Sequence, residues 1–167
     1  MKRVIVIGCP GSGKSTFARA LHERTGLPLY HLDMYFWNAD KTTVTKDVFL
    51  ERLNGLLAED EWIIDGNFRS TMELRMEKCD TVVLLDYPVE VCLDGVRRRI
   101  GTKRTDIPWV ETEEDEEFMD FIRRFNDESR PRMMELIEKF KGEKRIIIFK
   151  SREEAEAFLA ECVSFTG

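Results

Sequence analysis

Long hydrophobic runs are absent from this chain of 167 residues. The apolar stretch at residues 4–7 is too short for a transmembrane helix or a signal peptide, and it leads directly into a glycine-rich loop. Internal repeats, low-complexity tracts and linkers are missing as well. We therefore expect a cytoplasmic protein that has no membrane partner.

Paired cysteines are the second absence. The four cysteines, at positions 9, 79, 92 and 162, show no CxxC spacing, and the chain has only two histidines. A zinc site or a disulfide framework needs clustered ligands or regularly spaced cysteines. We therefore expect reduced thiols, which agrees with a cytoplasmic location.

An excess of positive charge is the third absence. Lysine and arginine total 26 against 32 aspartates and glutamates, a net charge of −6 that would repel nucleic acid as a whole. The length and the 43% hydrophobic content fit one α/β domain over residues 1–167 and exclude a multi-domain motor. Nucleic acid is therefore not an expected partner, and the sequence does not set the oligomeric state.

Residues 8–16 read GCPGSGKST, a complete GxxxxGK[ST] phosphate-binding loop that lies between an apolar strand pattern and a helix pattern. In such a loop the backbone N–H groups surround a phosphate chain, Lys14 reaches the β- and γ-phosphates, and the Ser15 hydroxyl binds Mg²⁺. The loop therefore predicts binding of a nucleoside triphosphate together with Mg²⁺. The residues expected to bind them are Gly8, Pro10, Gly11, Ser12, Gly13, Lys14, Ser15 and Thr16.

Short β-branched runs alternate with helical patterns, which is typical of a doubly wound parallel sheet with helices on both faces. We expect five strands, at residues 3–7, 29–31, 62–65, 81–86 and 145–149. Helices are expected at 13–24, at 46–58, after Pro88, and on both sides of Pro131. Two capping boxes, at 70–73 and 151–154, predict two further helix starts. The acidic run 113–117 is expected to begin a helix rather than to bind cations.

Polar side chains follow several of the predicted strands, at the edge where parallel sheets bind ligands. Asp33 comes just after the second strand, Asp65 ends the third, and Asp86 ends the fourth. Each carboxylate could hold a metal-bound water, orient an acceptor hydroxyl, or cap the next helix. His31 is expected to be a packed hydrogen-bonding residue rather than a general base.

Three segments in this order, GCPGSGKST, IIDGNFR and TVVLLDYPVEVCLDGVRRR, resemble the successive motifs of adenylate-kinase-like P-loop kinases. The combination of HLDMYFW with EWIIDGNFR resembles more closely a bacterial subgroup labelled DNA topology modulation proteins. The resemblance covers most of the chain and becomes loose beyond Arg104. It implies the fold of a P-loop nucleoside or nucleotide kinase with a short helical lid around residues 100–130.

The resemblance also implies roles for particular residues. Asp65 would hold the water shell of Mg²⁺ next to Ser15, while Gly66 and Arg69 would bind near the acceptor. Asp86 would be structural. Arg99 and Arg104, near the lid, would neutralise charge on the transferring phosphate. Residues 150–152 would lie against adenine, although an ordinary helix cap explains them equally well.

The acceptor pocket departs from nucleoside monophosphate kinases, because HLDMYFW replaces their usual arginine after the second strand. Asp33 suits a hydroxyl acceptor and Arg69 an anionic one, while Trp37 could stack on a base or pack in the core or the lid. We expect Mg²⁺-dependent transfer from ATP to a nucleotide, a nucleoside or a similar small polar acceptor. The alternative is an NTP-binding regulatory protein associated with DNA topology, with incidental ATPase activity. A GTPase switch is disfavoured, since no NKxD-like motif is present.

Overall fold

The computed structural model describes residues 1–162 and contains one five-stranded parallel sheet. Its strands lie in the order β2-β3-β1-β4-β5, all parallel. Their bounds are Arg3–Gly8 (β1), Leu29–His31 (β2), Trp62–Asp65 (β3), Thr81–Leu85 (β4) and Arg145–Phe149 (β5). The predicted fold class is confirmed, and the five predicted strands match within one residue at each end.

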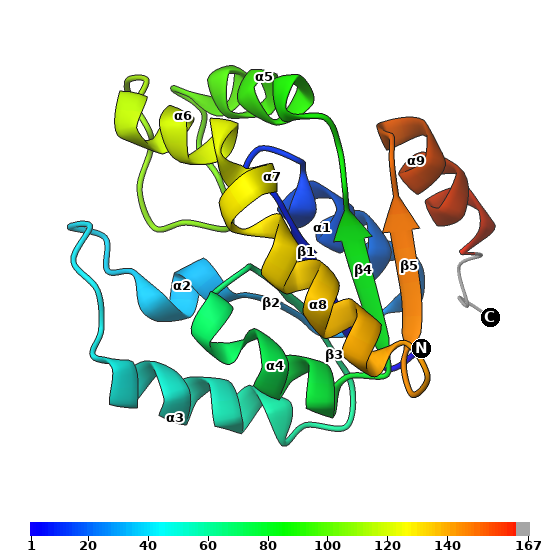
Figure 1. Cartoon of the computed structure of the whole chain (residues 1–167). Coiled ribbons are helices and arrows are strands. Elements are labelled where there is room, and N and C mark those ends of the chain that lie inside the picture. The colour runs from blue at the N-terminus through cyan, green and yellow to red at the C-terminus, as the bar shows by residue number, and fades with distance from the viewer. Residues whose placement is uncertain (163–167) are drawn as a thin grey trace.

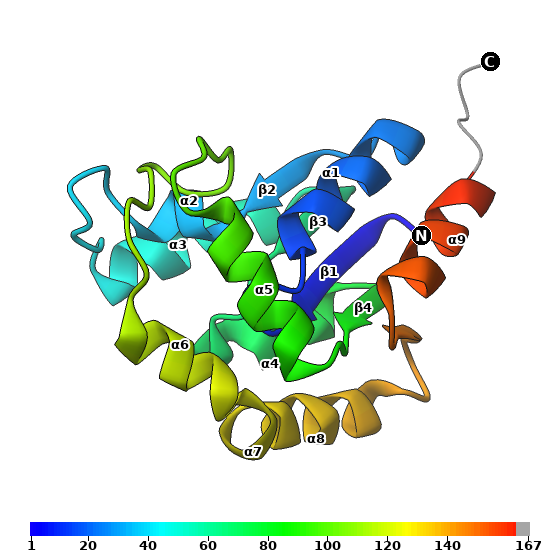
Figure 2. The same cartoon turned by 90° about the horizontal axis from the view of Figure 1, so that it is seen from above.

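Helices cover both faces of this sheet. Figure 2 shows α1 (Lys14–Thr25) and α9 (Arg152–Glu161) on one face, and α4 (Arg69–Lys78) and α8 (Arg130–Phe140) on the other. The helix α3 (Lys46–Leu57) connects β2 to β3, and the right-handed crossover places it on the face of α4. Above the carboxyl ends of the strands lie α5 (Val89–Arg99) and α6 (Glu116–Arg123), as Figure 1 shows. Two short helices, α2 (Leu32–Phe36) and α7 (Phe125–Glu128), complete the described chain.

The central strands are apolar because both of their faces are buried. Val4, Ile5, Val6 and Ile7 of β1 are all 0% exposed, and β3 and β4 are buried along their whole length. Burying one such side chain stabilises the fold by roughly 1.5–3 kcal/mol. A strand buried on both faces has no polar side to alternate with, which explains the continuous apolar runs in the sequence.

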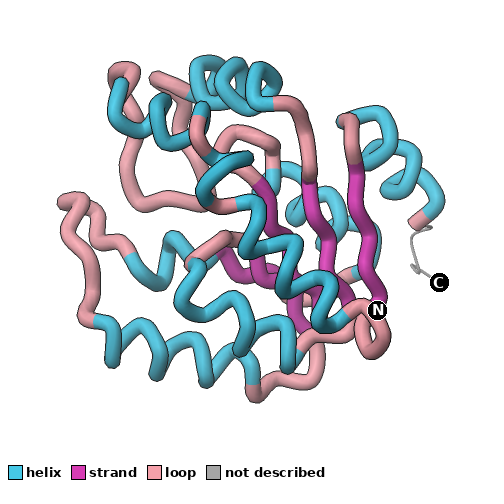
Figure 3. The backbone as a smooth tube through the Cα atoms, viewed as in Figure 1, coloured by secondary structure: helices cyan, strands magenta, loops and turns pink. Residues whose placement is uncertain are grey.

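The chain order puts a crevice at the carboxyl end of β1. From β1 the chain crosses to β2 at one edge of the sheet, while β4 and β5 lie on the other side of β1. The connection from β1 therefore runs toward β2, while the connection from its neighbour β3 runs the opposite way, to β4. Open α/β sheets bind ligands where neighbouring strands have connections in opposite directions. Figure 3 shows two long loops at this end, residues 37–45 and residues 100–115.

Some local expectations were wrong. The capping box at 70–73 does not form: α4 begins at Arg69 after Phe68, whose φ is 35°, and Glu73 instead pairs with Lys139 and Arg132 on α8. The short helix α2 was not predicted. The expected lid is helical only from Glu116, since residues 100–115 form an irregular loop.

Other helix signals are confirmed. Gly26 ends α1 in a left-handed conformation with φ 73°, and Ser151 caps α9 by accepting from the Glu154 amide. Asp115 caps α6, so the acidic run does begin a helix, and Pro131 lies in the first turn of α8. Within residues 1–162, no helix combines the length and apolarity needed to cross a membrane.

Candidate functional site

A cleft of about 1240 Å³ opens at the carboxyl ends of the strands. Its walls come from the phosphate loop, α2, the loop between β3 and α4, the end of α5, and the loop 100–115. All predicted site residues except Gly8 and Ser12 line it: Pro10, Gly11, Gly13, Lys14, Ser15, Thr16, Asp33, Trp37, Asp65, Gly66, Arg69, Arg99 and Arg104. Segments far apart in the sequence therefore meet around one space.

The phosphate loop has the backbone that its glycines permit. Gly11 and Gly13 have φ values of 83° and 95°, in the region that disfavours side chains. A Cβ on Gly11 would lie 2.0 Å from the Cys92 carbonyl oxygen, and a Cβ on Gly95 would lie 2.0 Å from the Gly11 carbonyl oxygen. The loop therefore packs directly on the backbone of α5, and both glycines are required for this approach.

Lys14 lies inside the loop. Its Nζ donates to the carbonyl oxygens of Gly8 (3.0 Å) and Cys9 (3.3 Å). Burial lowers the pKa of Lys14, while the negative charges of Asp65 and Asp33 oppose this effect. The ammonium group is thus positioned next to two carboxylates by backbone contacts that a phosphate could replace.

The two carboxylates differ in their surroundings. Asp65 is 6% exposed, and its Oδ2 lies 2.6 Å from Nδ1 of His31, its register partner on β2. Asp33 lies in the first turn of α2, where burial raises its pKa to about 6, against the opposing effect of Lys14. As expected, His31 is a hydrogen-bonding residue at the strand end. Asp33 is ionised at neutral pH but easily protonated.

Asn67 joins the end of β3 to the start of the phosphate loop. Gly8 N donates to its Oδ1 (3.1 Å), and its Nδ2 donates to Gly8 O (2.7 Å). Gly8 O therefore accepts from both Asn67 and Lys14. Sequence reasoning did not single out Asn67, because an asparagine after a strand is usually a turn residue.

Arg75 of α4 holds the loop between β3 and α4 in place. It is 0% exposed and donates to the carbonyl oxygens of Gly66 (2.8 Å), Asn67 and Phe68 (3.3 Å). Burial lowers its pKa to about 10, which leaves it charged at neutral pH. Three carbonyls held by one guanidinium explain how Phe68 keeps its left-handed backbone. No pattern in the sequence distinguishes Arg75 from the exposed charges of α4.

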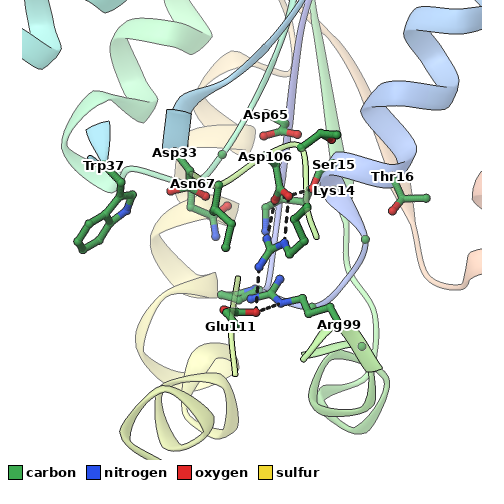
Figure 4. Close-up of a pocket in the computed structure, with 18 of the residues that line it drawn as sticks. Lys14, Ser15, Thr16, Asp33, Trp37, Asp65, Asn67, Arg99, Asp106 and Glu111 are labelled. Atoms are coloured by element: carbon green, nitrogen blue, oxygen red, sulfur yellow. Dashed lines mark hydrogen bonds and ion pairs between the residues drawn. The ribbon is translucent and has the colours of Figure 1, made fainter. Parts of the chain in front are cut away.

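The loop 100–115 folds onto the phosphate loop through an ion-pair network. Ser15 Oγ donates to Asp106 Oδ2 (2.9 Å), and Arg104 binds Asp106 through Nε (3.0 Å) and Nη2 (2.5 Å). Arg104 and Arg99 both donate to Glu111 Oε2, each at a distance of 3.1 Å. Figure 4 shows Asp106 beside Ser15 and Lys14, with Glu111 next to Arg99. Although Asp106 is largely buried, Arg104 holds its pKa at about 2.

An aromatic wall closes the side of the cleft next to α2. Trp37, at the end of α2, meets Trp109 of the loop 100–115 edge to face, with ring centroids 5.4 Å apart. Behind Trp37, the Phe36 ring packs against Phe49 and Phe68. Trp37 therefore both packs and lines the cleft. Trp109 was missed, because nothing in the sequence pairs residues from these two loops.

Asp86 belongs to a cluster of ion pairs that is separate from the cleft. Its carboxylate accepts two hydrogen bonds of 2.8 Å from Arg130 and pairs with Lys150. These contacts hold its pKa near 2 and tie α8 and the end of β5 to β4. Asp86 does not line the cleft, in agreement with the structural role expected for it.

Arg152 lies where the adenine side was expected. It lines the cleft, its guanidinium is 5.8 Å from the Tyr87 ring centroid, and Nη1 is 3.2 Å from where a Cβ on Gly13 would be. Its neighbour Ser151 is the N-cap of α9. Residues 150–152 thus include a helix cap, and they also place one cation at the phosphate loop.

The residues at the loop suit a Mg²⁺–nucleotide complex. The glycine backbone, Lys14 and the Ser15 hydroxyl lie together at the cleft, and they are the groups that this motif uses for a phosphate chain and its cation. Within residues 1–162, no three His, Cys, Asp or Glu side chains form a metal cluster of their own. A cation here would depend on Ser15, carboxylate-bound water and phosphate oxygens, which is the usual situation for Mg²⁺ in kinases.

Comparison with known proteins gives structural relatives only. No family model matches the chain, and no curated protein matches it. It is similar to shikimate kinase from Bacteroides thetaiotaomicron, with TM-score 0.55 and 21% identity, over 96% of this chain and 95% of that chain. It is also similar to a gluconokinase from Sinorhizobium meliloti 1021, with TM-score 0.58 and 18% identity, over 97% and 89%. A third is shikimate kinase from Acinetobacter baumannii in complex with shikimate, with TM-score 0.53 and 17% identity, over 96% and 90%.

These relatives establish that the chain has the fold found in small P-loop kinases. Identities of this size carry no statement about substrate. The DNA topology modulation subgroup, which the sequence resembles, has no counterpart among these structures and stays a prediction.

Proposed function

We propose that this protein is an ATP-dependent kinase that transfers the γ-phosphoryl group to a hydroxyl of a small polar acceptor. The observation that carries the proposal is the meeting, in one cleft, of the phosphate loop, two carboxylates, Arg99 at the end of α5 and Arg104 of the loop 100–115. Phosphoryl transfer needs mainly positioning and charge neutralisation, and these groups supply both.

Each group has a role in this proposal. The loop backbone and Lys14 bind the phosphates, Ser15 ligates Mg²⁺, and Asp65 orients the water around the cation. A cation held there would supply charge neutralisation to the phosphates. Arg99 and Arg104 stabilise the charge on the transferring group. Their present partners, Asp106 and Glu111, keep both guanidinium groups at the cleft.

Asp33 is the proposed proton acceptor. As the acceptor oxygen bonds to the γ-phosphorus and the bond to the β-phosphate oxygen breaks, the hydroxyl proton passes to the Asp33 carboxylate. A pKa of about 6 suits this task, because the group is charged at pH 7 yet can hold a proton. Gly66, Arg69 and Trp37 would surround the acceptor, with Arg69 available for an anionic substituent.

The acceptor class can be narrowed by a screen. Shikimate and gluconate, named with the structural relatives, are hydroxylated carboxylic acids, and they belong in it together with nucleosides and nucleoside monophosphates. The measurement is ADP production in a coupled assay, with and without each compound. We expect at least one class to raise turnover well above the basal ATPase rate. If no compound does so, the kinase proposal is contradicted.

A regulatory protein associated with DNA remains the second candidate, supported by the resemblance of HLDMYFW and EWIIDGNFR to the subgroup of that label. The net charge of −6 counts against it. The two functions are separated by titrating DNA at increasing salt, because phosphate contacts weaken steeply with ionic strength. Lack of DNA binding at low salt would remove this candidate.

A further inference from the structure

We propose that Asp106 positions the Ser15 hydroxyl toward the divalent cation, so that docking of the loop 100–115 and metal coordination strengthen each other. The inference rests on the proposed function, in which Ser15 is a metal ligand. It adds a residue from outside the recognised motifs, which lies 91 positions along the chain from the serine it contacts.

The contact leaves Ser15 able to bind a cation. A serine hydroxyl has one proton to donate and two lone pairs to offer. In the structure the proton is directed at Asp106 Oδ2 over 2.9 Å, which leaves the lone pairs of Oγ for a metal. A carboxylate that accepts a hydrogen bond from a metal ligand orients that ligand and increases its basicity, as carboxylates do for metal-bound histidines. The hydrogen bond and the metal bond are therefore compatible.

Asp65 does not fill this role in the structure. Its Oδ2 is engaged with His31 Nδ1 at 2.6 Å. The carboxylate bonded to Ser15 is that of Asp106, which is 6% exposed. Asp65 remains available to hold water around the cation, while Asp106 holds the protein ligand.

Asp106 is in turn rigidly held. Arg104 binds it with two hydrogen bonds, to Oδ1 through Nε and to Oδ2 through Nη2, and also donates to Glu111. Bidentate pairing fixes both the position and the plane of a carboxylate. Next to Asp106, Thr105 Oγ1 accepts from Arg19 of α1 over 2.9 Å. The loop therefore reaches the phosphate loop with Asp106 and Arg104 already in place.

Coupling of this kind is reciprocal. If the docked loop favours the cation, then the cation must favour the docked loop by the same factor. Mg²⁺ should therefore protect residues 100–111 in the nucleotide complex, beyond the protection that the nucleotide gives alone.

The test measures binding of a non-hydrolysable ATP analogue by calorimetry, with Mg²⁺ and with EDTA. The ratio of the two affinities is the metal gain. In Asp106→Asn we expect the metal gain to fall about 10- to 100-fold, the range found when a partner of a metal ligand is removed. A metal gain equal to or above that of the wild-type protein overturns the proposal, and a rise would identify Asp106 as an autoinhibitory contact instead.

Two comparisons show whether Asp106 acts through Ser15. In a Ser15→Ala background, Asp106→Asn should cause no further loss of metal gain, whereas a full additional loss would mean that Asp106 acts independently. Thr105→Val removes the neighbouring contact with Arg19 and leaves Asp106 intact, so it should retain the metal gain. An equal loss in Thr105→Val would show general loosening of the loop and overturn the proposal.

Hydrogen exchange on the wild-type protein provides a measurement that needs no variant to fold. Residues 100–111 should exchange more slowly with analogue and Mg²⁺ than with analogue and EDTA, and equal exchange contradicts the inference. Neither experiment uses an acceptor or turnover. The metal gain can therefore be interpreted even if the acceptor screen fails. An unchanged metal gain would contradict the role of Asp106 and would not contradict the kinase proposal.

Discussion

The two walls of the cleft are held together in different ways. The phosphate-loop wall rests on buried strands, glycines in backbone contact with α5, and side chains bonded to carbonyl oxygens, as Asn67 and Arg75 are. The wall formed by the loop 100–115 rests on ion pairs among Arg99, Arg104, Asp106 and Glu111. Backbone packing tolerates little movement, whereas an irregular loop held by side-chain ion pairs can separate as a unit when those pairs break. In the proposed function, the first wall would fix phosphates and the second would open and close over them.

The largest effect on activity is expected from Lys14→Ala in the phosphate-loop wall. Phosphate charge would lose its main side-chain partner there, and phosphoryl transfer should fall by about 10³-fold or more, with weaker ATP binding. The side chain donates only to carbonyl oxygens that water can satisfy, so the fold should persist. The coupled assay and circular dichroism measure both effects. Lys141→Ala, on the surface at the end of α8, is the matched control, and wild-type turnover in Lys14→Ala would refute the mechanism.

Asp33→Asn should lower kcat/KM for the identified acceptor by about 10²-fold, because general bases contribute roughly 10²–10⁴-fold. In the wild-type protein, activity should decline as the pH falls through about 6, where Asp33 becomes protonated. Unchanged kcat/KM in the variant would exclude Asp33 as the proton acceptor.

Asp33 should also lower the stability of the folded protein at neutral pH. The pKa of Asp33 is raised on folding, so folding is favoured while the group is protonated, and this contribution is lost as pH rises from about 4 to about 6. Asp33→Asn should therefore stabilise the protein at pH 7, on the order of 1 kcal/mol, and have little effect at pH 4. Thermal melting at the two pH values measures this difference. Equal effects at both would contradict it.

Arg75→Met tests whether the phosphate-loop wall depends on buried hydrogen bonds. The substitution leaves the carbonyl oxygens of the loop 66–68 without their donor, and each unsatisfied buried group costs about 1–3 kcal/mol. We expect a loss of about 3 kcal/mol in the free energy of unfolding, measured by urea denaturation. Arg123→Ala, an exposed arginine of α6, is the control. A loss below about 1 kcal/mol would mean that the loop holds its shape without Arg75.

The smallest loss of stability is expected from Glu111→Gln in the wall formed by the loop 100–115. Glu111 is partly exposed and shared by Arg99 and Arg104, so the loss should be at most about 1 kcal/mol and should shrink in high salt. Emission from Trp37 and Trp109, which meet across the cleft, reports whether the loop remains docked. A loss as large as that of Arg75→Met would show that the two walls are equally rigid.

Prediction from sequence succeeded where the signal is local. The strands, the glycine end of α1, the Ser151 cap and the glycine-rich backbone of residues 8–16 each depend on residues within a few positions of one another. The capping box at 70–73 failed although its pattern was present, because Arg75 organises the preceding loop and Glu73 finds partners on α8. Tertiary contacts there outweighed the local preference.

By itself, the sequence determined the alternation of buried strands and amphipathic helices, and it placed Lys14 and Ser15 in a glycine-rich loop between the first strand and the first helix. These features follow from periodicity and backbone geometry along a short stretch of chain. Only the tertiary structure decided which distant side chains serve that loop. Asp106 meets Ser15, Asn67 meets Gly8, and Arg75 supports Asn67 from within α4. The reason is that a hydrogen-bond partner is selected by the packing of the whole sheet and its connections, and many carboxylates and amides in the sequence could have served equally well.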